Sequence, residues 1–261
     1  MKKLLLSIFL SISLIANCWA GIDFDGIDDG IDTTDIANVE GALTISAWIN
    51  VDDLTNGYVI LAKYHSTNSL KSWLFRINST SELAFYTYNG SAQAVIASTN
   101  TISSDTWTHI LMTFDGTAGT DKVDFYINGA LCTLNATNDD TYVPANTATV
   151  ITMGRWASAT GFNDGISTEE AIWNVELTTA QIAQLASSRI KGMPLQIQST
   201  ALKGYWSMDD QETGTSADGD TVRDLSGNGN NGTGVDGANN TGLLWTGESI
   251  LSYTPNPIMW N

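Results

Sequence analysis

The stretch DLSGNGNNGTG, residues 224–234, has a composition that suits a cation site. Asp224, Asn228 and Asn230 offer side-chain oxygens, and the glycines between them let the backbone adopt positive φ angles and expose its carbonyl groups. Calcium takes about six to eight such hard oxygen ligands. The composition therefore predicts a calcium-binding turn. The alternative is a tight turn in which Asp and Asn bind their own backbone amides.

A second acidic stretch, DFDGIDDGIDTTD at residues 23–35, contains six aspartates. Asp28, Asp29 and Gly30 are typical of a turn between two strands. Aspartates two positions apart can share a cation, although a solvated turn beside a strand end explains the same pattern.

Three side chains on a predicted hairpin over residues 72–89 suit a sugar-binding face. If Trp73, Phe75 and Ile77 point into the core, Arg76 points outward with Tyr86 and Tyr88 of the partner strand. Aromatic rings can pack against sugar rings while arginine donates hydrogen bonds to hydroxyl groups. Trp156, near Phe162 and Asn163, is a separate candidate for a site on a loop. The alternative is that the tyrosines are ordinary strand residues.

The elements that must carry these residues are predicted to be strands. Residues 43–51 alternate, with apolar residues at 43, 45, 47 and 49 on one face and Thr44, Ser46, Trp48 and Asn50 on the other. Other short runs recur between turn signals such as Asp115-Gly116 and Asn128-Gly129. This pattern indicates an all-β fold, a two-sheet antiparallel jelly-roll sandwich. A single short helix is expected at 178–190. The other expected strands are 72–78, 83–89, 108–116, 121–129, 150–156, 169–175 and 202–210.

Several segments together resemble the laminin-G-like family of the concanavalin A-like lectin/glucanase superfamily. They are FDGIDD (24–29), ALTISAWI (42–49), DTWTHILMTFDG (105–116), VDFYING (123–129), ITMGRW (151–156), FNDG (162–165), EEAIWNVELTTAQIAQL (169–185), YWSMDDQETG (205–214) and DLSGNGNNGTG (224–234). The resemblance implies a concanavalin A-like sandwich and says little about the ligand.

The order of these segments departs from the family. The Tyr-Trp strand and the Gly/Asn-rich turn usually begin the domain, whereas here they follow all the other segments. The order indicates a circular permutation in which residues 202–234 return to complete the sandwich. A truncated second copy is the alternative, but a lone strand and turn cannot bury a face of their own. We therefore expect one domain over residues 21–242 and an extended tail over 243–261.

The resemblance also implies that the 224–234 turn lies near the strand carrying Glu169 and Glu170, either of which can add a carboxylate to the metal site. The family usually has Asp-Glu at this position. Related glucanases need two carboxylates about 5 Å apart on one strand. The usual Glu-x-Asp-x-x-Glu pattern is absent, and adjacent residues of a strand point to opposite faces. We therefore expect no enzymatic activity.

Residues 1–20 have the basic, apolar and small-residue regions of a secretory signal peptide. Lipidation at Cys18 is the alternative. Loss of the leader leaves Cys132 without a disulfide partner and makes the formal net charge of −17 more negative by two. Such a charge argues against nucleic acid and anionic membrane surfaces as partners. No later stretch is apolar enough for a transmembrane anchor.

These observations predict a secreted protein, extracellular or periplasmic, that binds a glycan or a cell-surface polysaccharide without catalysis and is stabilised by calcium. A structural surface protein without a sugar site is the first alternative. A divergent glycoside hydrolase or polysaccharide lyase is the second. The sequence does not determine the oligomeric state.

Overall fold

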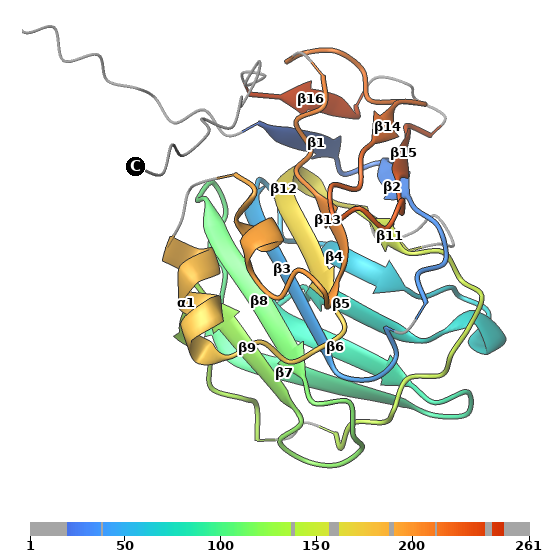
Figure 1. Ribbon diagram of the computed structural model, residues 1–261, viewed down its shortest axis with the longest axis vertical. Coiled ribbons are helices and arrows are strands. Elements are labelled where there is room, and N and C mark those ends of the chain that lie inside the picture. The colour runs from blue at the N-terminus through green and yellow to red at the C-terminus, as the bar shows by residue number, and fades with distance from the viewer. Residues whose placement is uncertain are drawn as a thin grey trace, which may run out of the picture.

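In the computed structural model the chain folds into two antiparallel β-sheets packed face to face (Figure 1). The structure describes residues 20–247 except 38, 137–138, 157–161, 188–190, 212 and 238–241. The predicted signal peptide, apart from Ala20, and the end of the predicted tail lie outside these residues. The predicted all-β sandwich with one short α-helix is confirmed within the described part of the chain.

Sheet A contains eight strands, with β12 at its centre. β12 (Asp164–Trp173) pairs with β3 on one side and with both β1 and β13 on the other. The remaining strands extend the sheet at its two edges. The order is β10 (Ala130–Leu131), β9 (Val123–Ile127), β8 (Thr108–Phe114), β3 (Leu43–Val51), β12, β1 (Gly21–Asp25) and β16 (Leu244–Thr246), with β13 (Leu202–Trp206) beside β12.

Sheet B also contains eight strands and joins N-terminal, central and C-terminal segments. Its order is β14 (Thr221–Val222), β15 (Gly232–Val235), β2 (Gly30–Asp32), β11 (Thr152–Met153), β4 (Tyr58–Lys63), β5 (Trp73–Ile77), β6 (Glu82–Tyr88) and β7 (Gln93–Thr101). The predicted strand at 150–156 is therefore reduced to two residues. Two short 3-10 helices, η1 (Asn68–Leu70) and η2 (Met193–Gln196), lie in loops.

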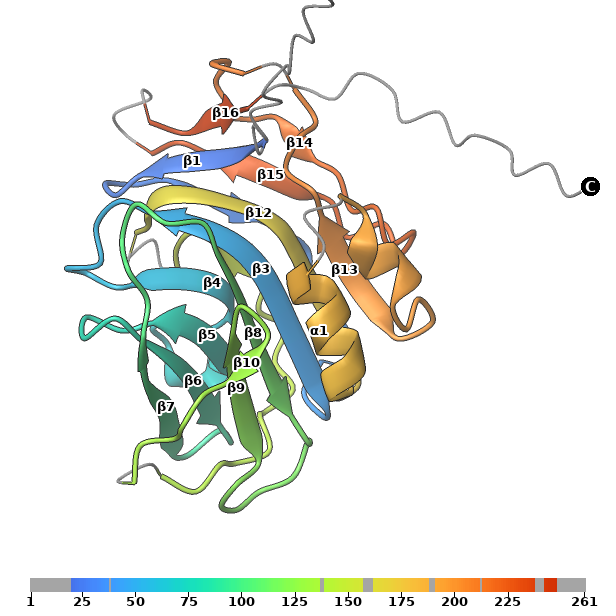
Figure 2. The ribbon, with the colours of Figure 1, turned by 90° about the vertical axis from the view of Figure 1, so that its left-hand side faces the viewer.

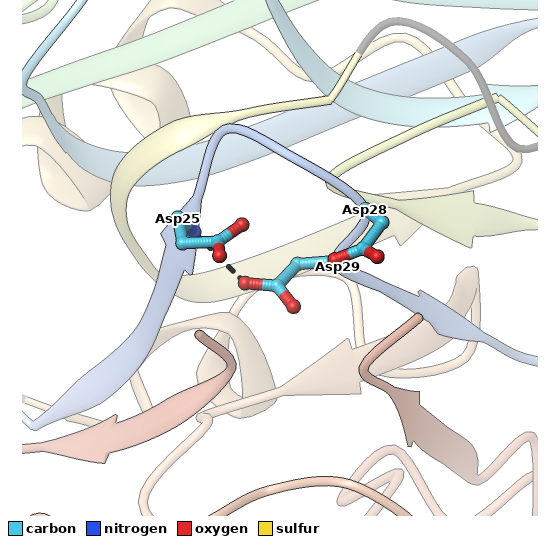
Figure 3. Close-up of side chains that lie close together, drawn as sticks. All are labelled: Asp25, Asp28 and Asp29. Carbon is cyan, nitrogen blue, oxygen red and sulfur yellow. Dashed lines mark hydrogen bonds between the residues drawn. The ribbon is translucent and has the colours of Figure 1, made fainter. Parts of the chain in front are cut away.

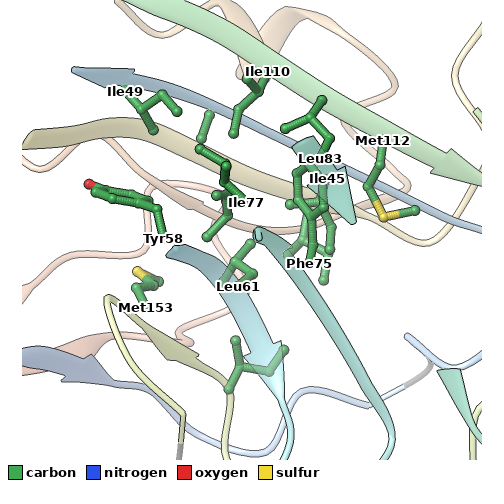
Figure 4. Packing of buried hydrophobic residues seen from close by; sticks show 14 of the residues in the cluster. Ile45, Ile49, Tyr58, Leu61, Phe75, Ile77, Leu83, Ile110, Met112 and Met153 are labelled. Atoms are coloured by element: carbon green, nitrogen blue, oxygen red, sulfur yellow. The ribbon is translucent and has the colours of Figure 1, made fainter. Parts of the chain in front are cut away.

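The core lies between the two sheets, where inward-facing residues of alternating strands meet (Figure 4). Ile45 and Ile49 of β3 and Ile110 of β8 face Phe75 and Ile77 of β5, as the alternation of these strands predicts. Burial of such side chains stabilises the fold by about 1.5–3 kcal/mol each. The α-helix α1 (Thr179–Ser187) covers the outer face of sheet A (Figure 2) and buries Ile182 and Leu185 there.

The C-terminal segment supplies strands to both sheets. β13 pairs with Glu170–Trp173 of β12, directly beyond the part of β12 that pairs with β1. β15 pairs with β2, and β16 pairs with β1. Residues 244–246, expected in an extended tail, are thus an edge strand of sheet A, with Trp245 only 1% exposed. None of the helices in the described residues is long and apolar enough to cross a membrane.

Candidate functional site

The predicted sugar-binding residues lie on the outer face of sheet B, around a floor of small apolar side chains. Val59, Ala62 and Leu74 form this floor and are almost fully buried. In the strand register Tyr86 lies opposite Leu74, and Arg76 lies opposite both Val59 and Ala84. Since side chains at every second position share a face, Arg76 and Tyr86 point outward together. Both are half-buried.

Trp156 joins this face, although the sequence indicated a separate site. Its ring lies 5.6 Å from the Arg76 guanidinium carbon, centroid to atom, and 5.9 Å from the ring of Tyr64, centroid to centroid. The first geometry is that of a cation–π contact and the second that of an edge-on aromatic pair. We call Tyr64, Arg76, Tyr86 and Trp156 the aromatic face.

The loop that carries Trp156 is fixed at both ends. Arg155 donates from Nη2 to both carboxylate oxygens of Asp32, at 2.8 and 2.9 Å. Beyond the loop, the Asn163 side chain accepts from the Val59 amide and donates to the Val59 carbonyl. The pairing of β4 with β5 shifts register between Val59 and Leu61. The Asn163 side chain thus binds the Val59 backbone where the pairing of β4 with β5 is irregular.

Arg76 is held in place by backbone carbonyls. Its Nε donates to Ile77 at 3.1 Å and its Nη2 to Asn56 at 3.0 Å. A Cβ atom at Gly57, whose φ is +75°, would lie 2.2 Å from Nη2, so only glycine permits this approach. Burial lowers the pKa of Arg76, but an arginine stays charged in proteins. Two of its five donor hydrogens are used in these bonds.

Tyr88 shares the face by strand alternation, but it is only 4% exposed. The Lys71 ammonium group lies 5.6 Å from its ring centroid and 5.1 Å from that of Tyr64. The prediction that Tyr88 presents an accessible ring is therefore wrong. Tyr64 and Lys71 are the residues that sequence reasoning missed. Tyr64 donates from its hydroxyl to Gln93 Oε1 at 2.7 Å, which fixes its ring.

The Gly/Asn-rich turn between β14 and β15 is a closed hydrogen-bonded structure. Asp224 accepts the amides of Tyr205, Ser226 and Asn230 at 3.1, 2.9 and 2.9 Å. Asn228 and Asn230 donate from Nδ2 to backbone carbonyls of Leu202 and Lys203. These contacts use the oxygens of Asp224 and direct the amide donors, not the oxygens, toward the strand. The turn thus has the backbone hydrogen bonds of the alternative interpretation, and calcium binding by it stays a prediction.

Glu169 and Glu170 bind hydroxyl groups of sheet A. Glu169 accepts the Tyr205 hydroxyl on the outer side of sheet A, whereas Glu170 accepts the Ser167 hydroxyl. Glu169 has a φ of +54° and lies at a register shift between Thr168 and Ala171. Burial raises the pKa of Glu169 to about 7 and that of Glu170 to about 8. These hydrogen-bond partners of both carboxylates lie outside the 224–234 turn.

Replacing Asp224 tests this interpretation of the turn. We expect Asp224→Ala to lower the free energy of unfolding by about 2–4 kcal/mol, because three amides lose a charged acceptor. Thermal unfolding in calcium and in a chelator measures the loss. The difference between wild type and variant should be the same in both buffers. A difference that disappears in the chelator would show that the turn holds an ion.

Within the described residues, the acidic group with metal-like spacing is instead Asp25, Asp28 and Asp29 (Figure 3). Burial is the largest factor that raises the pKa of Asp29, to about 7. The charges of Asp25, Asp236 and Asp28 raise it further, while the hydrogen bond from the Asp25 amide lowers it. Of the other aspartates in that stretch, Asp32 pairs with Arg155 and Asp35 with Lys63.

A family model described as the concanavalin A-like lectin/glucanases superfamily, of the laminin G type, matches residues 25–183, more than half of the chain. The chain belongs to this family. The match ends before β13, so the strands that the C-terminal segment supplies lie outside it. No curated protein matches the sequence.

Solved structures are similar to this chain at low sequence identity. One is a Bacteroides ovatus protein provisionally described as carbohydrate-binding, at 18% identity and a TM-score of 0.57, covering 83% of this chain and 58% of that one. The chain thus spans little more than half of that protein. A heptameric SAP-like pentraxin from Limulus polyphemus matches at 19% identity and a TM-score of 0.48, covering 64% of this chain and 82% of that one. Domains LG4-5 of the mouse laminin α1 chain match at 12% identity and a TM-score of 0.46, covering 59% of this chain and 41% of that one.

Proposed function

We propose that this protein is an exported, non-catalytic glycan-binding module and that the aromatic face on sheet B binds the sugar. The observation that carries the proposal is the assembly of Arg76, Tyr86 and Trp156, from three separate segments, on one half-exposed face. Half-buried rings offer apolar surface for the C–H face of a sugar ring, and the guanidinium offers donors for hydroxyl groups.

The positioning of these groups supports binding rather than a purely structural role. Arg76 is oriented by two carbonyls and a ring, and Trp156 by an ion pair and an amide bridge on either side of its loop. A binding site gains affinity when its side chains are fixed before the ligand arrives. Family membership agrees with a lectin-like function, and the fold alone does not specify one.

Glycan-array binding with matched variants tests the proposal. Arg76→Ala is expected to weaken binding at least tenfold, because a charged hydrogen bond contributes about 1.5–3 kcal/mol. Tyr86→Ala and Trp156→Ala should weaken it comparably. Arg223→Ala removes an exposed arginine paired with Asp210 and should leave binding unchanged.

The outcomes also separate the competing functions. A folded wild type that binds no glycan on the array would contradict the proposal and favour a structural surface protein that makes protein contacts. Release of reducing ends from a polysaccharide panel would instead indicate a hydrolase. Loss of binding in Arg223→Ala as well as in Arg76→Ala would mean that general charge, not the aromatic face, attracts the ligand.

A further inference from the structure

Two chain segments cross between the sheets at the same end of the sandwich, where β1, β2, β15 and β16 meet (Figure 1). The first joins β1 to β2, and the second lies between β15 and β16, where the structure describes residues 236–237 and 242–243. Val235 pairs with Gly30, and Leu244 pairs with Asp23. Continuing these antiparallel registers places Asp236 opposite Asp29 and Gly242 opposite Asp25.

Three carboxylates of the first crossover point toward one another. One oxygen from each of Asp25, Asp28 and Asp29 lies within 4.8 Å of the other two (Figure 3). Asp29 is fully buried, and its Oδ2 accepts the Asp25 amide at 2.8 Å. Its Oδ1 is also buried and has no hydrogen-bond partner among the described residues. An unpaired buried carboxylate oxygen is costly unless a cation or a proton compensates it.

The second crossover carries a further carboxylate, Asp236, whose charge acts on Asp29. Asp236 is 8% exposed, and its buried Oδ1 has no hydrogen-bond partner in the described part of the chain. Its Oδ2 accepts the Gly242 amide at 3.2 Å. A Cβ atom on Gly242 would lie 2.2 Å from Asp25 Oδ2, and one on Gly237 would lie 2.5 Å from Asp28 Oδ2. Asp236 is therefore bracketed by two residues whose backbone contacts the other carboxylates.

We propose that Asp25, Asp28, Asp29 and Asp236 bind a calcium ion that ties the N-terminal crossover to the C-terminal one. Neither Asp29 nor Asp236 has an ion-pair partner among the described residues. Carboxylate oxygens from irregular loops suit the flexible coordination of calcium, whereas magnesium requires near-octahedral geometry. Gly237 and Gly242 leave backbone close to the carboxylates of Asp28 and Asp25.

The proposed ion binds at the end of the fold formed by β1, β2, β15 and β16, whereas the aromatic face is built on β4, β5 and β6. The inference does not depend on glycan binding. The ion would strengthen the attachment of the C-terminal segment to the N-terminal one, since its ligands lie more than two hundred positions apart in the chain.

Isothermal titration of the full chain with calcium chloride, after chelator treatment, tests the proposal. We expect one calcium ion per chain and a higher melting temperature in calcium than in chelator. Asp29→Asn and Asp236→Asn should each weaken calcium binding at least tenfold, since even outer-shell partners of a metal site contribute about 10–100-fold. Asp121→Asn is the matched control, because it removes an exposed aspartate whose φ of +53° asparagine tolerates.

The variants also make a prediction without metal. In chelator, Asp29→Asn and Asp236→Asn should be at least as stable as wild type, because each removes a negative charge from an uncompensated group. In calcium they should lose the rise in melting temperature that wild type and Asp121→Asn keep. A wild type that binds no calcium, binds magnesium alone, or shows the same calcium shift in all variants would overturn the proposal.

Discussion

A chain that ends at Gly192 is expected to show no cooperative unfolding transition. The missing segment supplies β13, β14, β15 and β16, and with them Trp206, Met208 and Trp245 of the core cluster. Truncation of one buried tryptophan to alanine typically costs about 3–5 kcal/mol. The loss of two tryptophans and their strands should therefore remove most or all of the roughly 5–15 kcal/mol of free energy of unfolding that a domain has. Circular dichroism during thermal and guanidinium unfolding measures the effect.

A chain that ends at Gly247 is the control for this truncation. It keeps every described residue, including β16, and should melt close to the full-length temperature. If the chain ending at Gly192 instead melts cooperatively at the full-length temperature, the C-terminal strands are an appendage. The sandwich would then be complete without them, which the pairing of β13 with β12 and of β15 with β2 argues against.

Glu170→Gln is expected to be more stable than wild type at pH 9 and to lose this advantage at pH 5. Burial raises the pKa of Glu170 in the folded protein to about 8, from 4.5, and the hydrogen bond from Ser167 lowers it only in part. The folded state therefore binds this proton more tightly than the unfolded state does. The stability of wild type accordingly falls as the pH rises from about 4.5 through about 8.

The size of this effect follows from the buried position of the carboxylate. Each pKa unit corresponds to about 1.4 kcal/mol, so the advantage of the glutamine at pH 9 should reach a few kcal/mol. Guanidinium unfolding at pH 5 and pH 9, in chelator, measures it. The control variant Glu176→Gln replaces an exposed carboxylate, so its stability should change with pH in the same way as that of wild type. An equal stability difference between Glu170→Gln and wild type at both pH values would contradict the prediction.

Polar residues within the strands and turn signals beside them made several strands predictable. β3, β5, β6, β8 and β9 each lie within one or two residues of their expected bounds. β4 was not predicted, because Tyr58 to Ala62 form an apolar run in which no alternation exists to detect. β7 was missed because exposed polar residues at its end resemble a loop. Tyr64 was missed together with β4.

The sites depended on contacts that the local sequence does not contain. Arg76 and Tyr86 were predictable because hairpin register and alternation place them, whereas the meeting of Trp156 with Arg76 depends on how a distant loop folds over the sheet. The turn at Asp224 has the composition of a metal loop, yet the same oxygens accept its own amides. Asp236 becomes a candidate ligand only through the pairing of β15 with β2.

A crystal structure of the chain with the oligosaccharide that binds best on the array tests the central claim most directly. The account predicts a sugar ring packed on Trp156 or Tyr86 at carbon–carbon distances of about 4 Å, with a hydroxyl group within hydrogen-bond distance of the Arg76 guanidinium. A sugar bound on the outer face of sheet A, or at loops remote from β5 and β6, with the aromatic face unchanged, would contradict it.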